Sequence, residues 1–348
     1  MKEEVSVVVV HPSIPADGRW IDDFVDPAAP YRFVKVGAEE AVSWHRRGKT
    51  TNLAEWRRHF RQARRAMNQR SDVVIANFPP LTLACCFWKA AMFSSTRVIG
   101  WSFNFGGGSK GRAARVAGKL FKRASLLITH SRGEIPVYAK AFDLPESRLT
   151  FVPCQRGTIN VEPSAERFDV IAMGSAGRDY RSFCAAVEGT GLKTLLIAKP
   201  DVIQGIDIPA NVEVRNGLSM AECLSLSSAA RVNVVPIAET QNAAGQVTFL
   251  TAMAMGKAIV ATDCTGTRDY LTDGQDALLV APKDVAGLRN AILSLMEDQE
   301  LCDKLARAGY RRWQENFSDE AAGKALREVL DRVTGNKQGA ASAPEMCH

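Results

Sequence analysis

The stretch that decides the fold is residues 243–263, AAGQVTFLTAMAMGKAIVATD. It opens with small residues around Gly245, continues as a run of helix-forming residues, and returns through Gly256 to the apolar segment Ala258–Ala261. This order predicts a loop, a helix over 246–255 and a buried strand, as in a parallel βαβ unit. The sequence around it should therefore be examined for further units of the same kind.

Short β-branched segments alternate with helical segments along the whole chain, which is typical of parallel sheets with crossover helices. In the first half we expect strands at Val5–Val10, Phe33–Val36, Asp72–Ala76, Arg97–Trp101, Leu126–Thr129 and Leu149–Val152. In the second half we expect strands at Asp169–Met173, Thr194–Ala198, Val212–Val214, Val232–Val235, Ala258–Ala261 and Leu278–Val280. Helices are expected at 53–69, 80–92, 111–124, 133–142, 180–188, 219–228, 246–255, 286–297, 299–315 and 319–333.

A chain of 348 residues is too long for one hydrophobic core, so two domains are expected. The polar stretch that begins at Pro153 and contains Gly157 and Pro163 is typical of a linker. We predict an α/β fold of two Rossmann-like, doubly wound domains, residues 1–157 and 165–316, with an interdomain cleft at the carboxyl ends of their strands. A C-terminal helix over 317–334 is expected to pack back on the first domain, followed by a disordered tail over 335–348.

The charge is unevenly divided between the two halves. The whole chain has a formal net charge of +6, but residues 1–150 hold 24 Lys and Arg against 13 Asp and Glu, which is +11. Helices 53–67 and 112–123 each carry an apolar stripe among arginines and lysines, as an ordinary amphipathic helix packed on a sheet would. Their density of arginine favours contact with anionic lipid; nucleic acid is the rival anion, but no nucleic-acid motif is present.

The cysteines and the apolar runs indicate the cellular compartment and whether a metal site is expected. The eight cysteines are scattered without metal-ligand spacing, which favours a reducing compartment and no metal. The apolar run Val5–Val10 suits a buried strand better than a leader, and Leu81–Phe93 is too short to span a bilayer. We therefore expect a cytoplasmic protein, peripherally associated with the inner face of the cell membrane.

Two loops carry the residues of a phosphate site. The segment 174–179, GSAGRD, follows the expected strand Asp169–Met173; its small residues let the backbone approach a ligand, and the guanidinium of Arg178 can hold a diphosphate. The N–H groups of Gly245–Val247 would add the positive end of a helix dipole. A tight turn with no ligand explains the second loop equally well.

Residues 251–262, TAMAMGKAIVAT, resemble the C-terminal signature of glycosyltransferase family 4 and its GT-B relatives, roughly Glu, seven residues, then Glu-Ala-Met-Ala-x-Gly-x-Pro-Val-Val-Ala-Thr. The segments 267–271 and 277–280 resemble the continuation of that signature. The likeness covers about 165–315, whereas residues 1–160 match in architecture alone. It implies a GT-B fold and transfer of a sugar, with retention, from a nucleotide-diphosphate sugar to a glycan or a polyprenyl-diphosphate-linked glycan. A UDP-sugar is expected ahead of a GDP-sugar, with no cofactor, in bacterial surface polysaccharide synthesis such as that of exopolysaccharide.

The resemblance also assigns residues to the donor side. Arg178 and a later lysine, for which we choose Lys199 with Arg181 in reserve, would neutralise the leaving diphosphate as catalytic residues. The donor would be bound by Gly174, Gly177, Asn216, Gly217, Gly245, Gln246, Val247, Thr248 and Thr251. The two family glutamates fall on Ala243 and Thr251, so both carboxylates are replaced, although the Thr251 hydroxyl could serve the ribose. This departure favours one alternative, a non-catalytic partner of a transferase that binds nucleotide-sugar or membrane. A GT-B-fold sugar-nucleotide epimerase would have the same cleft, but the missing carboxylates argue against it.

The acceptor side is less defined, because the first half carries no such signature. Several polar side chains follow expected strands there, where they would line the cleft. Turn-forming and structural roles explain them at least as well. The acceptor-side candidates are His11, Asp17, Asn77, Asn104 and His130.

Overall fold

The computed structural model describes residues 4–14, 18–38, 51–105, 112–238 and 243–336, and everything below concerns these. The chain forms two compact units. Unit 1 comprises Met1–His130, Ile135–Val152 and the segment from Ala322 onward, and unit 2 comprises Ser131–Glu134 and Pro153–Ala321. The boundary expected after residue 157 thus lies at Val152. The acceptor-side candidate Asp17 and nearly all of the predicted tail lie outside the described residues.

Unit 1 is built on a parallel six-stranded sheet with the order β2-β1-β3-β4-β5-β6. Apolar β-branched runs such as VSVVVV form strands buried on both faces, which parallel sheets require. The strands are β1 (Val5–Val10), β2 (Tyr31–Val36), β3 (Val73–Asn77), β4 (Arg97–Trp101), β5 (Leu126–Thr129) and β6 (Leu149–Phe151). The helices that follow them are α1 (Leu53–Met67), α2 (Pro79–Ala91), α3 (Arg112–Phe121) and α4 (Glu134–Phe142).

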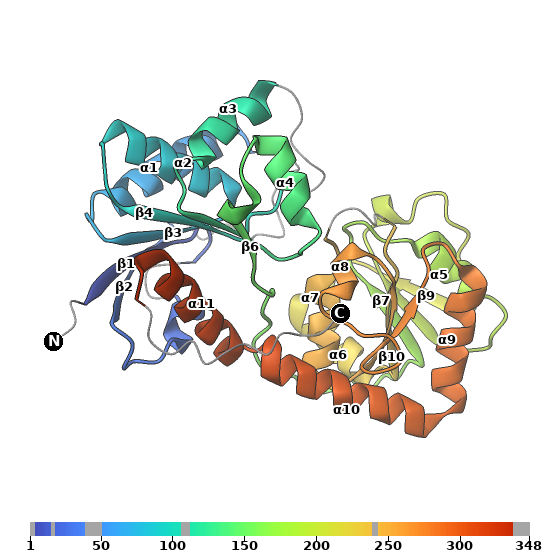
Figure 1. The fold of residues 1–348 in the computed structure, drawn as a ribbon. Helices are drawn as coiled ribbons and strands as arrows, with labels where there is room; N and C mark the ends of the chain where they lie inside the picture. Colours follow the sequence, from blue (N-terminus) through green and yellow to red (C-terminus); the bar gives the residue numbers. More distant parts are fainter. Residues whose placement is uncertain (1–3, 15–17, 39–50, 106–111, 239–242, 337–348) are drawn as a thin grey trace. The chain divides into compact units, whose positions relative to one another are not determined.

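Alternate side chains of the unit 1 strands enter two different cores. Val8 and Val10 of β1 pack with residues of α1 to α4 in one cluster, whereas Val7 and Val9 pack with residues of α11 (Asp319–Thr334) in another. In Figure 1, α1, α2 and α3 accordingly cover one face of this sheet and α11 covers the other. Helix α11 is fixed there by the Tyr31 hydroxyl, which donates to Asp331, and by close packing of Gly323 against the Phe24 carbonyl.

Unit 2 repeats the architecture with the strand order β12-β11-β10-β7-β8-β9. Its strands are β7 (Val170–Met173), β8 (Thr194–Ile197), β9 (Val212–Arg215), β10 (Val232–Val235), β11 (Ala258–Thr262) and β12 (Leu278–Val280). Its helices are α5 (Tyr180–Val187), α6 (Met220–Ala229), α7 (Gln246–Ala254), α8 (Thr265–Arg268), α9 (Val285–Glu297) and α10 (Gln299–Asn316). Side chains of α5, α9 and α10 pack on one face of the sheet, and those of α6 on the other.

The predicted helices and strands are confirmed throughout the described residues of both units. Every expected strand and every expected helix is present, with ends displaced by at most three residues. The short helix α8 was not predicted, because its four residues, TGTR, are too few to show a period. The α/β fold of two doubly wound domains is therefore observed.

Candidate functional site in unit 2

The site lies where the sheet of unit 2 changes direction. The chain runs from β7 outward through β8 and β9, then returns to form β10 on the other side of β7. Strands β7 and β10 are direct parallel neighbours, with Val170 opposite Val232. The loops that leave their carboxyl ends therefore diverge, and ligands of doubly wound folds bind at this position.

Backbone contacts join the two loops beside this point. The Ala238 N–H donates to the Gly177 carbonyl at 2.9 Å, and the Asp179 N–H donates to the Pro236 carbonyl at 3.1 Å. Arg178 and Ile237 form an antiparallel bridge between these bonds. The loop after β7 is thereby held against the segment that leads toward α7.

Arg178 is the central cation of the site. Its Nη2 donates to Thr248 Oγ1 at 2.9 Å, its Nη1 to the Ala176 carbonyl at 2.8 Å, and its Nε to the Met173 carbonyl at 3.3 Å. Burial lowers the pKa of Arg178, yet an arginine stays charged near neutral pH. Within the described ranges, no ion pair joins this guanidinium to a carboxylate. A desolvated cation in this state is stabilised by an anionic ligand.

Gly174 makes room for that guanidinium. Its φ of +120° lies in a region that side chains disfavour, and a Cβ added there would come within 2.8 Å of Arg178 Nη2. The Gly174 carbonyl accepts a hydrogen bond of 2.5 Å from the Tyr180 hydroxyl, and burial raises the pKa of Tyr180. The sequence predicted that Gly174 lets a ligand approach the backbone. In the structure, the group that packs closely on Gly174 is the guanidinium of Arg178.

Helix α7 begins at the same place. Its N-cap is Gly245, with a left-handed φ of +91°, and a Cβ at this residue would lie 3.0 Å from Ile237 Cδ1. Thr248 on the first turn meets Arg178, while Val247 is exposed and Gln246 partly so. The positive end of the helix dipole is thereby added to the guanidinium charge.

Thr251, a candidate donor-binding residue, is hydrogen-bonded within its own helix. The residue is buried on the core side of α7, and its hydroxyl donates to the Val247 carbonyl at 2.5 Å. The residue is only 2% exposed in this conformation, and a contact of its hydroxyl with a ribose stays a prediction. Sequence alone could not reveal this, because a threonine on a helix can either project outward or bond back to the preceding turn.

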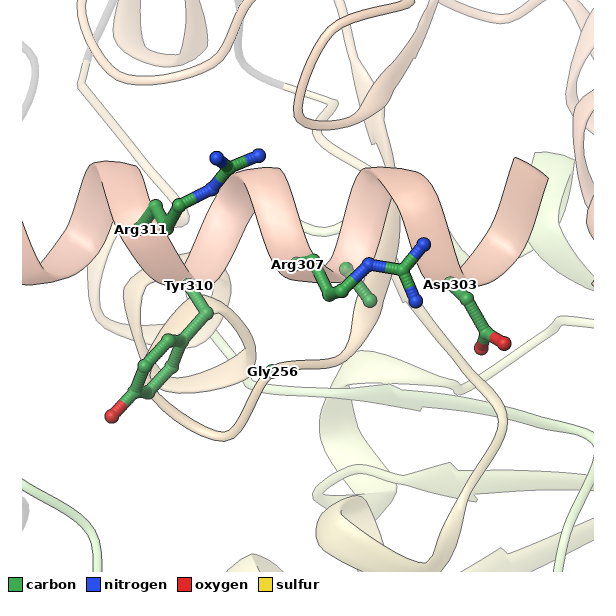
Figure 2. A pocket seen from close by; sticks show the side chains of 6 residues that line it. Gly256, Asp303, Arg307, Tyr310 and Arg311 are labelled. Atoms are coloured by element: carbon green, nitrogen blue, oxygen red, sulfur yellow. The ribbon is translucent and has the colours of Figure 1, made fainter. Parts of the chain in front are cut away.

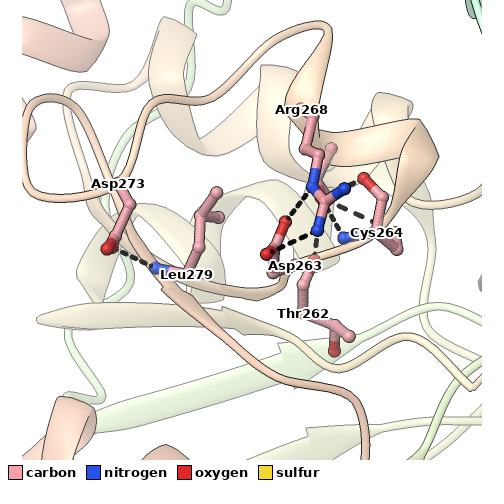
Figure 3. Close-up of polar contacts among 7 residues, drawn as sticks. Thr262, Asp263, Cys264, Arg268, Asp273 and Leu279 are labelled. Atoms are coloured by element: carbon pink, nitrogen blue, oxygen red, sulfur yellow. Dashed lines mark hydrogen bonds and ion pairs between the residues drawn. The ribbon is translucent and has the colours of Figure 1, made fainter.

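A third loop, after β11, adds groups that sequence reasoning missed. Figure 3 shows Arg268 of α8 gripping Asp263 with two hydrogen bonds, of 2.6 and 2.9 Å. Arg268 lowers the pKa of Asp263 in return. A Cβ at Gly266 would lie 3.0 Å from Ala243 Cα, so this loop packs on the residues that precede α7. The opposite charges are visible in the sequence, but only the unpredicted helix α8 brings them together.

The other donor-side candidates follow the next strands, farther from the switch point. Lys199 is exposed after β8, and the alternative Arg181 donates to the Gly205 carbonyl at 2.8 Å. Asn216 and Gly217, with φ +73°, are exposed after β9. The described contacts join Arg178, Gly174, Gly177, Gly245 and Thr248 into one cluster; they do not connect Lys199 or Asn216 to it.

The acceptor-side candidates belong to unit 1. His11 Nδ1 accepts from the Ser13 N–H at 3.1 Å, and its ring lies 5.4 Å from that of Phe78. Asn77 is buried, with Nδ2 donating to the Val10 carbonyl at 3.4 Å, whereas Asn104 is exposed. His11 thus follows β1 and Asn77 ends β3, the pair of strands at which the unit 1 sheet reverses direction.

His130 has a partner that the sequence did not suggest. Its Nδ1 lies 2.7 Å from the Val152 carbonyl, and its Nε2 lies 2.9 Å from Ser102 Oγ. Desolvation lowers the pKa of His130, which favours the neutral imidazole. Because a carbonyl oxygen can only accept, the ring proton lies on Nδ1, and Nε2 accepts from the serine hydroxyl. Ser102 has a φ of +53°, a strain that is common at functional positions and invisible in a sequence.

A hollow elsewhere in unit 2 is distinct from the switch point. It is open to solvent, has a volume of about 570 Å³, and is lined by Gly256 and by Asp303, Ala306, Arg307, Tyr310 and Arg311 of α10. Figure 2 shows these side chains along one helix above Gly256. Gly256 precedes β11, so the hollow lies toward the amino ends of the strands. The described residues contain no group of His, Cys, Asp and Glu side chains suited to a metal ion.

Comparison with known proteins agrees with this architecture. Residues 183–298 match the family model described as glycosyl transferases group 1. Glycogen synthase from Mycobacterium tuberculosis is 30% identical over 100 residues, which are 28% of this chain and 24% of that protein. The match thus spans about a quarter of the length of its curated relatives.

Solved structures resemble the chain over almost its whole length. Sucrose-phosphate synthase from Thermosynechococcus elongatus has a TM-score of 0.65 at 15% identity, covering 96% of this chain and 100% of that one. Anabaena HepE in complex with UDP-glucose has a TM-score of 0.65 at 13% identity, covering 94% of this chain and 100% of that one. The fold is therefore the GT-B fold of glycosyltransferases, and the predicted resemblance is confirmed in the fold and in the family model over 183–298.

Proposed function

We propose that this protein is a glycosyltransferase that binds a nucleotide-diphosphate sugar at the switch point of unit 2. The observation that carries the proposal is the Arg178 guanidinium, packed over Gly174 and 2.9 Å from Thr248 on the first turn of α7. A fixed cation and a helix N-terminus directed at one place are complementary to a diphosphate. The family match over 183–298 supports the same reaction class.

The chemistry follows from where charge develops. As the bond between the anomeric carbon and the diphosphate oxygen breaks, negative charge accumulates on the leaving group. Arg178 and the dipole of α7 are in place before the reaction and stabilise that charge without rearrangement. We propose Lys199, exposed after β8, as a second cation for the same group. Retention of the anomeric configuration is proposed from the resemblance.

The donor and acceptor are proposed by chemical class. HepE binds UDP-glucose in its crystal structure, and we propose a UDP-sugar ahead of a GDP-sugar for this chain. We propose as acceptor a hydroxyl of a glycan or of a polyprenyl-diphosphate-linked glycan, in bacterial surface polysaccharide synthesis. The proposed location is the cytoplasmic face of the cell membrane. No helix of the described residues is long and apolar enough to span a bilayer.

A thermal-shift panel of UDP, GDP, ADP, dTDP and CMP on the purified protein tests the proposal. A ligand at about 100 times its Kd stabilises the folded state by about 2.7 kcal/mol. A shift with one nucleoside diphosphate would identify the donor base and direct the search to its sugars. The absence of a shift with any diphosphate would contradict donor binding in unit 2.

A second candidate is a non-catalytic partner that binds nucleotide-sugar without transferring it. It is favoured by Ala243, which has no carboxylate where the family has one, and by the buried hydroxyl of Thr251. A sugar-nucleotide epimerase is the third class. Product analysis separates the three, since a transferase needs an added acceptor, an epimerase converts the free UDP-sugar, and a binding partner does neither.

A further inference from the structure

The outer helices of unit 1 carry a concentration of positive charge. Residues 53–123 contain fourteen Lys and Arg but only two Asp and Glu. Helices α1, α2 and α3 of this stretch lie together on one face of the sheet (Figure 1). The exposed basic residues include Arg57, Arg61, Arg64 and Arg65 on α1 and Arg115 and Lys119 on α3.

Helix α2, which contacts both α1 and α3, has the opposite character. Its sequence, PPLTLACCFWKAA, contains one charged residue, Lys89, whose Nζ donates to the Arg123 carbonyl at 3.2 Å. A helix that is apolar on every side is normally buried. Here one side is buried in the core, but Phe87 is 39% exposed on the other, and Met92 just beyond the helix is 38% exposed.

The exposed aromatic residue of α2 is held firmly by its neighbours. The ring of Phe87 lies 5.2 Å from Phe60 of α1 and 5.4 Å from Trp88, and Trp88 Nε1 donates to the Phe60 carbonyl at 2.9 Å. The Arg64 guanidinium lies 5.3 Å from the Trp88 ring. Aromatic residues fixed beside arginines are typical of surfaces at the boundary between water and lipid.

Phe93 is the most exposed of these side chains. It is 97% exposed and has a φ of +50°, which is unfavourable for a bulky residue. The Ser94 N–H donates to the Lys89 carbonyl at 3.0 Å and closes the end of α2, so the turn fixes Phe93 outward. Nothing in the described fold is stabilised by a phenylalanine at this position.

We propose that the exposed faces of α1, α2 and α3, together with Met92 and Phe93, form a docking surface for an anionic lipid bilayer. The arginines and lysines would lie among the headgroups, with Phe87, Met92 and Phe93 at the acyl boundary. A second copy of this chain docked through the same surface would bring like charges together, and a nucleic acid would offer no apolar phase for Met92 and Phe93. The inference deepens the proposed location at the membrane and rests on it, but not on the donor chemistry.

Co-sedimentation of the full chain with vesicles tests the surface. Phosphatidylcholine vesicles with and without phosphatidylglycerol are compared at about 0.1 M salt, where charges are screened beyond about 10 Å. Binding is expected to be at least about tenfold stronger to the anionic vesicles, since each basic residue near the surface contributes. Phe93→Ser should weaken it about fivefold or more by removing the inserted ring.

Matched variants show whether binding depends on this surface or on any exposed charge or apolar side chain of the protein. Arg57→Glu with Arg61→Glu reverses an i, i+4 pair on α1, and Arg307→Glu with Arg311→Glu reverses an exposed pair of the same spacing on α10. Met220, 50% exposed at the start of α6, is the control for Phe93. The α1 pair should lose about tenfold or more in binding, while the α10 pair and Met220→Ser stay within about twofold. Circular dichroism checks that each variant folds.

The results distinguish the surface from the enzyme. Equal binding to neutral and anionic vesicles, or equal losses from the α1 and α10 pairs, would overturn the docking surface. So would capture of a single-stranded RNA with no binding to anionic vesicles, which would assign the basic helices to nucleic acid. The nucleoside diphosphate thermal shift should be the same in Phe93→Ser as in the parent protein. Vesicle binding without such a shift in the parent protein would count against the proposed transferase and leave the surface in place.

Discussion

The two units share one architecture but differ in what stands at the point where each sheet reverses. In unit 2 the helix after β10 opens with Gly245, Gln246 and Val247, all of which carry an N–H. In unit 1 the equivalent helix after β3 opens with Pro79 and Pro80, neither of which carries one. Proline is well suited to start a helix, but it removes the donors that bind an anion there. The same fold thus has helix N–H groups at the proposed phosphate site of unit 2 and lacks them at the first two residues of α2 in unit 1.

The cations differ as well. Unit 2 places one partly buried guanidinium, Arg178, against the first turn of α7, without an ion pair among the described residues. Unit 1 has many more basic residues, and several of them are exposed on the outer helices α1 and α3. We therefore assign the excess charge of residues 1–150 to the proposed docking surface, and the proposed donor site to Arg178 in the less basic unit. Net charge describes an affinity for anions and does not locate a site.

The largest effect should come from removing that cation. Arg178→Ala should lower turnover by about 10²- to 10³-fold, the usual loss when one preorganised donor to the developing charge is removed. It should also abolish the thermal shift by the nucleoside diphosphate. Arg181→Ala is the matched control, because Arg181 points to the Gly205 carbonyl. Near-normal turnover in Arg178→Ala, measured with the identified donor, would show that the unit 2 site does not depend on this cation. The proposed difference between the two units would then be wrong.

Gly174→Ala sharpens the comparison by displacing the guanidinium without deleting it. A Cβ at this position would lie 2.8 Å from Arg178 Nη2, so we expect about tenfold weaker binding of the nucleoside diphosphate by calorimetry. Gly191→Ala is the control, because Gly191 has a φ of +72° and no atom within 4 Å of its added Cβ. Both variants should lose about 1 kcal/mol of stability from the unfavourable φ. Equal losses of binding in the two would mean that the contact with Arg178 is irrelevant.

How far the sequence predicts this molecule depends on the kind of feature. Apolar runs such as Val170–Met173 predict buried parallel strands because both faces of such a strand are covered. The place of Arg178 in the loop after β7 was predictable because small residues after a strand let a neighbouring side chain and a ligand come close, whereas its role at a diphosphate stays a prediction. The side-chain direction of Thr251, the φ of Ser102 and the exposure of Phe87 on α2 were not, because they depend on packing between segments distant in the chain.

Lys199 tests whether the site needs the second cation. The residue is exposed after β8, and an exposed charge contributes about 0–1 kcal/mol. Lys199→Met should therefore reduce turnover by no more than about fivefold, far less than Arg178→Ala. A loss as large as that of Arg178→Ala, at saturating donor, would show that Lys199 moves onto the diphosphate when the donor binds. The site would then be larger than the cluster around Arg178.

The smallest effect concerns pH, and it belongs to unit 1. Desolvation lowers the pKa of His130 below its usual value of about 6.5, so the folded state keeps the ring neutral where the unfolded chain binds a proton. Stability from this residue is present above about pH 6.5 and is lost as the pH falls toward the folded-state pKa. His130→Gln should therefore lose less thermal stability between pH 7.5 and about 5.5 than the parent protein, by a few degrees at most.

Ser102→Ala is the control for that measurement, because it removes the hydroxyl 2.9 Å from Nε2 but keeps the half-buried imidazole. It should retain the pH-dependent loss, since desolvation is the main cause of the lowered pKa. Arg178, the central charge of the unit 2 site, does not titrate over this range. An unchanged pH dependence in His130→Gln would mean that the ring of His130 is solvated in the folded state. The protonated form of His130 could then contact an acceptor substrate. A reduced dependence would leave unit 1 with a neutral, prearranged hydrogen-bonding pair and unit 2 with the fixed charge.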